Sequence, residues 1–265
     1  MACNEKILEG LLRRNAVVEE LMAYKEENKM PMLQPEQEER QRIWLEKQME
    51  GHRHKQEVET VFQAILKSSK KIQARKLFSY NIVLIGFMGS GKSTISEYLH
   101  TLFDMEIIEM DQMIAQREGM SISDIFETRG EEYFRNLETS LLIEMQERSN
   151  VVISCGGGVP LREQNVVEMK KNGRVVLLTA SPETILERVK DSHERPLLEN
   201  NKNTEFIAGL MEARREKYQA AADIIVATDG KTELEICEEL VKKLVDFDRK
   251  EGRKIWKREY QDIQV

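Results

Sequence analysis

Apolar residues recur at helical spacing through the first 80 residues and predict an all-helical region. The segment 30–35, which contains two prolines, ends a first helix; a second helix is expected over 36–49 and a third over 56–77. The region before residue 80 has two glycines and no strand-like run. The apolar positions of the first helix are Leu8, Leu11, Leu12, Val18, Leu21 and Met22.

After residue 80 the pattern changes to short apolar runs separated by amphipathic helical stretches. Strands that alternate with helices predict a parallel sheet with helices on both faces, whose ligand site lies along the carboxyl ends of the strands. The expected strands are 82–85, 105–108, 151–154, 175–178 and 224–226. The expected domains are an all-α domain over 1–78, an α/β domain over 79–248 and a charged extension over 249–265.

Composition narrows the class of protein. Of 265 residues, 40% are hydrophobic and 33% charged, as in a globular protein with solvated helices. The net charge of −7 disfavours non-specific nucleic-acid binding, and no apolar run has the length of a membrane span. Three widely spaced cysteines and no recognisable signal peptide suggest a reducing compartment, so we expect a cytoplasmic protein.

Residues 86–93 read G-F-M-G-S-G-K-S, between an apolar run and a helical stretch. Strand, glycine loop, lysine and helix in this order predict a phosphate-binding loop rather than an ordinary glycine-rich turn. Its backbone N–H groups and the helix N-terminus would hold phosphates, Lys92 would reach the terminal phosphates, and Ser93 would bind Mg²⁺. The predicted ATP-binding residues here are Gly89, Ser90, Gly91, Lys92, Ser93 and Thr94.

Charged residues follow the second expected strand. Glu109 and Asp111 could face Mg²⁺ and a substrate hydroxyl; alternatively they belong to a solvated loop in which Asp111 caps the next helix. Arg135 and Glu138 are three apart on one helix, where an ordinary intrahelical ion pair is the alternative to a binding role.

Three consecutive glycines, 156–158, follow the third expected strand, with Pro160 expected to start the next helix. Their conformational entropy cost suggests that the backbone must approach a ligand closely. Arg188, Arg195 and Arg214 lie further along the chain, around a polar stretch (191–203) that suits a mobile lid. Each arginine taken alone is more simply a surface charge. Together at one edge of the sheet, the three arginines suit a reaction in which several anionic groups take part.

Residues 81–245 resemble shikimate kinase in the order and spacing of six motifs: G-F-M-G-S-G-K-S-T, the carboxylate pair, F-R-x-x-E, G-G-G-V, R-P-L-L and R-x-x-x-Y. The resemblance implies a small-molecule P-loop kinase with a five-stranded parallel sheet. It also implies transfer of the γ-phosphate of ATP, with Mg²⁺, to the 3-hydroxyl of shikimate.

The resemblance gives roles to individual residues. Arg135 and Arg214 would bind the shikimate carboxylate, Asp111 would orient the attacking hydroxyl, and Lys92 and Arg195 would stabilise the transferring phosphoryl group. The remaining implied contacts are Gly156, Gly157 and Gly158 to the acid, Arg188 against adenine, and Ser93 and Glu109 to Mg²⁺. Glu109 stands where the family usually has aspartate. The alternatives are a kinase for another hydroxy acid such as gluconate, or a non-catalytic nucleotide-binding scaffold.

Residues 1–78 resemble the all-helical, type II chorismate mutase domain. The resemblance rests on Arg14, Lys25, Glu38, Ser69 and Gln73. It implies that chorismate is rearranged to prephenate in a homodimer of swapped helices. The first helix starts too late to supply the arginine that the family borrows from its partner, and Gln34 and Gln37 replace an aspartate and an arginine. A helical module that serves only dimerisation or regulation is therefore the alternative.

Overall fold

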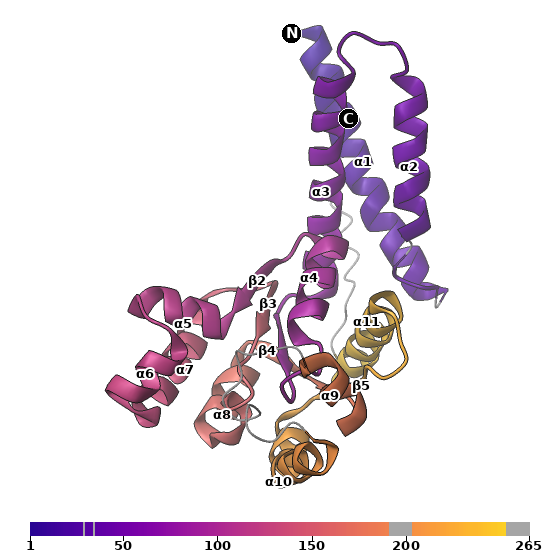
Figure 1. Cartoon of the computed structure of the whole chain (residues 1–265). Helices are drawn as coiled ribbons and strands as arrows, with labels where there is room; N and C mark the ends of the chain where they lie inside the picture. The colour runs from indigo at the N-terminus through magenta and orange to yellow at the C-terminus, as the bar shows by residue number, and fades with distance from the viewer. Residues whose placement is uncertain (29, 34, 191–202, 253–265) are drawn as a thin grey trace. The chain divides into compact units, whose positions relative to one another are not determined.

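The computed structural model describes residues 1–28, 30–33, 35–190 and 203–252 (Figure 1). Contacts between residues divide the chain into two compact units. One contains Met1–Leu77, Leu102–Asp104 and the chain from Val245 onward, and the other contains Phe78–Thr101 and Met105–Leu244. We call them the helical unit and the sheet unit.

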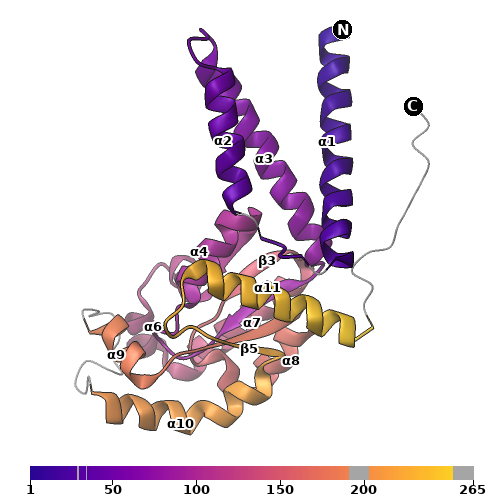
Figure 2. The same ribbon diagram turned by 90° about the vertical axis from the view of Figure 1, so that its right-hand side faces the viewer.

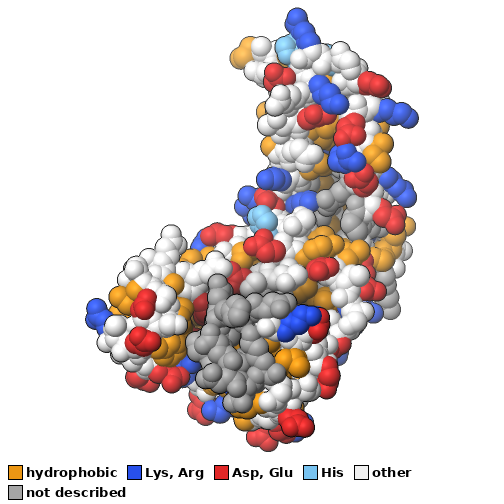
Figure 3. All heavy atoms as spheres, in the orientation of Figure 1, with side chains coloured by type: hydrophobic (Ala, Val, Ile, Leu, Met, Phe, Trp, Pro, Cys, Tyr) orange, Lys and Arg blue, Asp and Glu red, His pale blue; other side chains and the backbone are white. Residues whose placement is uncertain are grey.

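Three helices make up most of the helical unit: α1 (Ala2–Glu27), α2 (Pro35–Gln48) and α3 (Lys55–Leu77). The second and third begin and end within one residue of the ranges expected from the apolar spacing. Val18 and Met22 of α1, Leu45 of α2 and Leu77 of α3 are buried. Lysine, arginine and acidic side chains are interspersed over the visible face of these helices (Figure 3).

The sheet unit contains five parallel strands in the order β2-β3-β1-β4-β5, as the alternating pattern predicted. The strands are β1 (Asn81–Ile85), β2 (Glu106–Glu109), β3 (Val151–Ser154), β4 (Gly173–Thr179) and β5 (Ile224–Ala227). The central strands β1 and β3 are buried along their whole length, whereas the edge strand β5 alternates between buried and exposed residues. This is the burial expected for a sheet that is covered on both faces.

Eight α-helices of the described chain connect or follow these strands. They are α4 (Lys92–Phe103), α5 (Met110–Glu118), α6 (Ile122–Arg129), α7 (Glu131–Glu144), α8 (Glu163–Lys171), α9 (Pro182–Val189), α10 (Thr204–Ala221) and α11 (Glu233–Lys250). Two short 3₁₀ turns, Met145–Glu147 and Val159–Leu161, flank β3. Figure 2 shows α4 and α11 on one side of the sheet, with α8 and α10 on the other.

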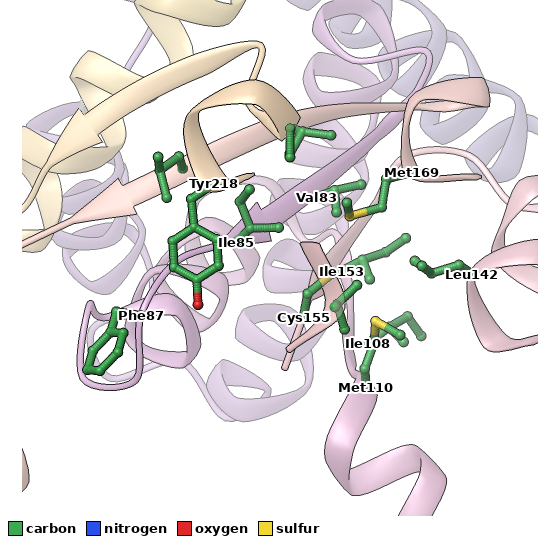
Figure 4. Close-up of a cluster of buried hydrophobic side chains, with 14 of the residues drawn as sticks. Val83, Ile85, Phe87, Ile108, Met110, Leu142, Ile153, Cys155, Met169 and Tyr218 are labelled. Atoms are coloured by element: carbon green, nitrogen blue, oxygen red, sulfur yellow. The ribbon is translucent and has the colours of Figure 1, made fainter. Parts of the chain in front are cut away.

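An apolar core cluster is formed by one sheet face and the helices α5 to α10. Val83 and Ile153 belong to it from the neighbouring strands β1 and β3, together with Leu142 of α7 and Met169 of α8 (Figure 4). Leu177 of β4 is part of the same cluster. Because successive side chains of a strand point to opposite faces, the buried residues between them pack on the other side. The sheet is therefore packed on both faces beneath the loops at its edge.

The strand order places a topological switch point beside β1. The chain passes from β1 to β2 on one side and from β3 to β4 on the other, while β1 and β3 are hydrogen-bonded neighbours. Ligands of open α/β sheets bind in the crevice at the carboxyl ends of such strands. The phosphate loop follows β1 and the glycine triplet follows β3, so both sequence motifs meet at this crevice.

Three details differ from the expectations. Glu109 is the last residue of β2 rather than part of the following loop. Pro160 lies in a short 3₁₀ turn, and α8 starts at Glu163. Helix α11 continues to Lys250, so the boundary expected at 248/249 falls within a helix. In the described chain, no helix is long and apolar enough to cross a membrane.

Candidate functional site

The loop between β1 and α4 has the backbone that a phosphate-binding loop needs. Gly86, Gly89 and Gly91 all have positive φ angles, of 150°, 78° and 97°, a region that favours glycine. A Cβ on Gly86 would lie 2.4 Å from the Leu178 backbone oxygen, so a side chain there would collide with β4. The loop leads directly into the N-terminus of α4 at Lys92. The helix N-terminus and the loop amides together form a site for anions.

Lys92 lies against this loop. Its Nζ donates hydrogen bonds to the backbone oxygens of Gly86, at 3.0 Å, and of Phe87, at 3.2 Å. The ammonium group is therefore held over the loop rather than extended into solvent. It lies where the terminal phosphates of a nucleotide in the loop would need a cation.

A cavity of 430 Å³ opens beside the phosphate loop. Arg188 of α9 forms one wall, where it donates to the Gly89 oxygen at 3.2 Å and to Thr228 Oγ1 at 3.0 Å. The cavity thus joins the loop after β1 to the segment after β5. Its lining residues are Gly89, Gly91, Lys92, Ser93, Thr94, Ile95, Arg188, Thr228, Lys231, Glu233 and Ile236.

The glycine triplet after β3 lies against the acid-side residues that the sequence singled out. A Cβ on Gly158 would be 2.1 Å from Arg135 Nη1, and a Cβ on Gly156 would be 2.6 Å from Asp111 Oδ1. A Cβ on Gly157 would be 3.9 Å from Arg214 Nη1. Side chains at 156 and 158 would thus displace Asp111 and Arg135. Glycines at 156 and 158 therefore let Asp111 and Arg135 keep their observed positions.

Arg214 also reaches the phosphate loop. Its guanidinium carbon lies 5.7 Å from the centre of the Phe87 ring, a cation–π distance. Tyr218, one turn further along α10, donates from its hydroxyl to the Gly157 backbone oxygen at 2.7 Å. Figure 4 shows the Tyr218 hydroxyl pointing away from the aliphatic cluster. These contacts place the triplet and the phosphate loop side by side.

Arg135 is fixed by carboxylates on both sides along α7. Its guanidinium pairs with Glu138 at 2.9 Å and with the exposed Glu131 at 2.9 Å. Glu138 is fully buried, and burial raises the pKa of its carboxyl to about 7, against the opposing charge of Arg135 and with some support from Asp111. The intrahelical ion pair proposed as an alternative therefore exists, but it lies at the glycine triplet and orients Arg135 there.

The structure also decides the capping alternative for Asp111 and gives the state of the nearby Cys155. Asp111 does not cap α5: the cap position is Glu109, and Asp111 is the second residue of the helix. Cys155, at the end of β3, is buried, and burial raises its pKa far above neutrality, which keeps the thiol protonated.

A second cavity, of 590 Å³, lies within the helical unit. Arg14 and Lys25 of α1 line it together with Ser69 and Gln73 of α3, so four of the five mutase-like residues meet there. Lys25 is buried, which lowers its pKa, and donates to the Met32 oxygen at 3.1 Å. Arg13, Gln37, Gln41 and Lys70 add polar groups to the wall. The described lining contains no acidic side chain, so the cavity suits an anion.

Comparison with known proteins decides the family. Residues 88–245 match the family model of shikimate kinase, and residues 1–74 match that of chorismate mutase type II. The chain belongs to the shikimate kinase family. This is a family of ATP-dependent kinases, and the match covers more than half of the chain.

Individual relatives agree with the family match. The shikimate kinase of Dehalococcoides mccartyi is 40% identical over 172 residues, which are 65% of this chain and 97% of that protein. The solved shikimate kinase from Aquifex aeolicus is 41% identical with a TM-score of 0.53, covering 62% of this chain and 95% of the other. The enzyme from Acinetobacter baumannii, solved in complex with shikimate, has a TM-score of 0.57 at 30% identity, over 66% and 96% of the two chains.

The residues beside the phosphate loop fit a magnesium ion shared with a nucleotide. Ser93 offers a hydroxyl at the start of α4, and Glu109 offers a carboxylate linked to α4 through Ser96. These are the hard oxygen ligands that Mg²⁺ prefers, usually few in number and completed by phosphates and water. The described residues contain no group of three His, Cys, Asp or Glu side chains that could hold a metal by themselves.

The sequence missed some residues of the kinase site and named others that cannot be placed. Thr228 and Lys231 line the cavity beside the phosphate loop, and the polar segment after β5 that contains them carries no motif that would have identified them. Ser90, one of the predicted ATP-binding residues, has no exposed surface. Arg195 lies outside the described residues, and so does the side chain of Glu38 within α2.

Glu138 makes stability depend on pH. Because its pKa is higher in the folded protein than the usual 4.5, the folded state takes up a proton as the pH falls through this window. The contribution of Glu138 to stability is therefore greatest at low pH and decreases as the pH rises from about 4.5 to about 7. We expect the stability of wild type relative to Glu138→Gln to be greater at pH 5 than at pH 8, by about 1–3 kcal/mol.

Chemical denaturation at both pH values measures this difference. Glu131→Gln is the matched control, because Glu131 pairs with the same guanidinium but is exposed. An unchanged difference between wild type and Glu138→Gln at pH 5 and pH 8 would contradict the shifted pKa.

Proposed function

We propose that the sheet unit transfers the γ-phosphate of ATP to the 3-hydroxyl of shikimate. The observation that carries this proposal is the glycine triplet, which brings Asp111, Arg135 and Arg214 together next to the phosphate loop. A triphosphate in that loop would face a small carboxylic acid held at the triplet. The family membership and the shikimate-bound relative support the same assignment.

The residues divide into a nucleotide side and an acid side. Loop amides from Gly89 to Lys92 would bind the β- and γ-phosphates, and Arg188 would lie against the adenine base. Ser93, and Glu109 through a water, would hold Mg²⁺, which supplies charge neutralisation on the phosphates when bound. Lys92 would stabilise the charge that develops on the transferring group, and Arg195 is proposed to add to it.

On the acid side, Arg135 and Arg214 would bind the carboxylate with charge-assisted hydrogen bonds. Asp111 would accept a hydrogen bond from the attacking hydroxyl and orient its lone pair toward the phosphorus. Little covalent chemistry is required of the protein in phosphoryl transfer, because positioning and electrostatic stabilisation supply most of the rate. The two arginines and the close approach at the triplet favour shikimate over an acyclic acid such as gluconate.

A homodimer through the N-terminal helices and a cytoplasmic location remain proposals. The dimer is supported by apolar side chains that stay exposed on the described helices, because such patches commonly mark interaction surfaces. Among them on α1 are Ile7, Leu8, Leu12 and Leu21.

The substrate can be tested by coupling ADP release to a spectrophotometric readout. We expect turnover with shikimate and at least a hundredfold lower kcat/KM with gluconate. Lys92→Ala should reduce kcat by a thousandfold or more, because the charge on the transferring phosphoryl group loses its cation. ATP binding without turnover of either acid would support the scaffold alternative, and a preference for gluconate would replace the substrate.

Arg135→Ala should separate acid binding from nucleotide binding. Loss of a charge-assisted pair predicts a KM for shikimate raised about 30- to 150-fold, with the dissociation constant for ADP within about twofold of wild type. Arg214→Ala, which leaves the Arg135–Glu138 pair intact, should behave in the same way. The exposed Arg129→Ala on α6 is the control. Equal losses of acid and nucleotide affinity would contradict the assigned role.

We also propose that the cavity of the helical unit binds chorismate and converts it to prephenate. The specific support is the convergence of Arg14, Lys25, Ser69 and Gln73 on one cavity without a described acidic wall. The cations would bind the two carboxylates, and Gln73 would donate to the ether oxygen whose bond breaks.

A chorismate-disappearance assay on the full chain tests this second activity. Gln73→Ala should lower kcat/KM by about a hundredfold, because one hydrogen-bond donor to the developing charge is lost. Gln63→Ala on the exposed side of α3 is the matched control. Absence of turnover in the wild-type chain would leave a dimerisation or regulatory role for this unit.

A further inference from the structure

A buried serine links the two residues proposed to hold magnesium. Ser96 lies one helical turn after Ser93 on α4 and has no exposed surface. Its hydroxyl lies 2.9 Å from the Ser93 backbone oxygen and 3.0 Å from Glu109 Oε1 at the end of β2. The Ser96 hydroxyl therefore lies between the Glu109 carboxylate and the backbone oxygen of Ser93, the serine of the phosphate loop.

The contact between Ser96 and Glu109 is not explained by the local geometry of helix α4. A serine inside a helix commonly hydrogen-bonds to a preceding carbonyl of its own helix, and the bond to Ser93 alone would be of that kind. Glu109, however, is 13 residues away and on another element. It occupies the cap position of α5 without making a side-chain capping bond, so its carboxylate is directed to α4 instead.

The length of the Glu109 side chain explains why a contact that restricts its carboxylate would favour metal binding. Glutamate has one more rotatable bond than aspartate, and a flexible carboxylate loses more entropy when it is fixed beside a metal. A hydroxyl that holds Oε1 removes part of that freedom before any ligand binds. A carboxylate has two oxygens, each able to accept hydrogen bonds, so the second can still accept from a metal-bound water.

We propose that Ser96 is a positioning residue that fixes the Glu109 carboxylate for the magnesium–nucleotide complex. Ser96 does not touch the metal or the nucleotide itself. It acts through Glu109, in the way that residues behind a metal ligand commonly set its orientation. The inference rests on the magnesium role proposed above for Ser93 and Glu109.

The test compares ADP affinity with MgCl₂ and with EDTA, by titration calorimetry on the full chain. Ser96→Ala should reduce the metal-dependent gain in ADP affinity about five- to tenfold, the loss expected for one hydrogen bond to a charged group. Affinity in EDTA should stay within twofold of wild type. Thr101→Ala is the matched control, because Thr101 is an exposed residue of the same helix that bonds the Glu97 oxygen.

A double-mutant cycle separates the proposed link from a general effect on α4. Glu109→Asp shortens the side chain, so we expect its carboxylate to lie beyond the reach of Ser96. In that background, Ser96→Ala should cause little further loss of the metal-dependent gain in ADP affinity. Electron paramagnetic resonance of Mn²⁺ in the ADP complex provides a second readout. We expect weaker Mn²⁺ binding in Ser96→Ala and recovery toward wild type in Ser96→Thr, which restores the hydroxyl.

Three results would overturn the inference: an unchanged metal-dependent gain in Ser96→Ala, an equal loss of ADP affinity with and without metal, or full additivity in the cycle. The outcome is independent of the acid substrate. Shikimate turnover with an unaffected metal response would reject the Ser96 role and leave the kinase assignment standing. The expected metal response without shikimate turnover would support the Ser96 role and reject the shikimate kinase assignment.

Discussion

The close approach of backbone and polar side chains at the glycine triplet is the constraint on which the site depends. Gly156 and Gly158 occupy space that a side chain could take only by displacing Asp111 or Arg135. The triplet follows β3, which is hydrogen-bonded to the strand that carries the phosphate loop. Sheet register thus sets the distance between the two halves of the site. The relative placement of the glycine triplet and the phosphate loop is thus a property of the parallel sheet as much as of the individual side chains.

The two arginines of the crevice, Arg135 and Arg214, have different surroundings. Arg135 is held between a buried and an exposed carboxylate, whereas Arg214 rests on the face of Phe87. Both guanidinium groups lie at cation–π distance from an aromatic ring, Arg135 from Phe134 at 5.5 Å and Arg214 from Phe87 at 5.7 Å, and Arg135 is in addition held by carboxylates. The two guanidinium groups are directed to the same small region without competing for a common partner, which suits a ligand that offers one carboxylate.

The sequence predicted the sheet well because strand and helix periods are distinct and the phosphate loop marks one strand end without ambiguity. The resemblance to shikimate kinase named Asp111, Arg135 and Arg214 together, and the structure places all three beside the glycine triplet; their roles toward a substrate stay a prediction. The sequence could not locate Glu109 within β2, because a terminal carboxylate does not alter the apolar pattern. Thr228 and Lys231 were missed for a similar reason: a short polar turn after a strand carries no motif. The bond from Ser96 to Glu109 joins two elements, and no local pattern encodes such a contact.

The hydrogen bonds of Lys92 to its own loop affect the stage at which this side chain loses conformational entropy. A free lysine side chain samples many rotamers, and ordering it costs up to about 2 kcal/mol. Here the carbonyls of Gly86 and Phe87 already restrict that sampling. If the loop binds phosphates as proposed, they would meet a lysine side chain whose freedom is already restricted. Much of the entropy loss of ordering Lys92 would then belong to folding rather than to nucleotide binding.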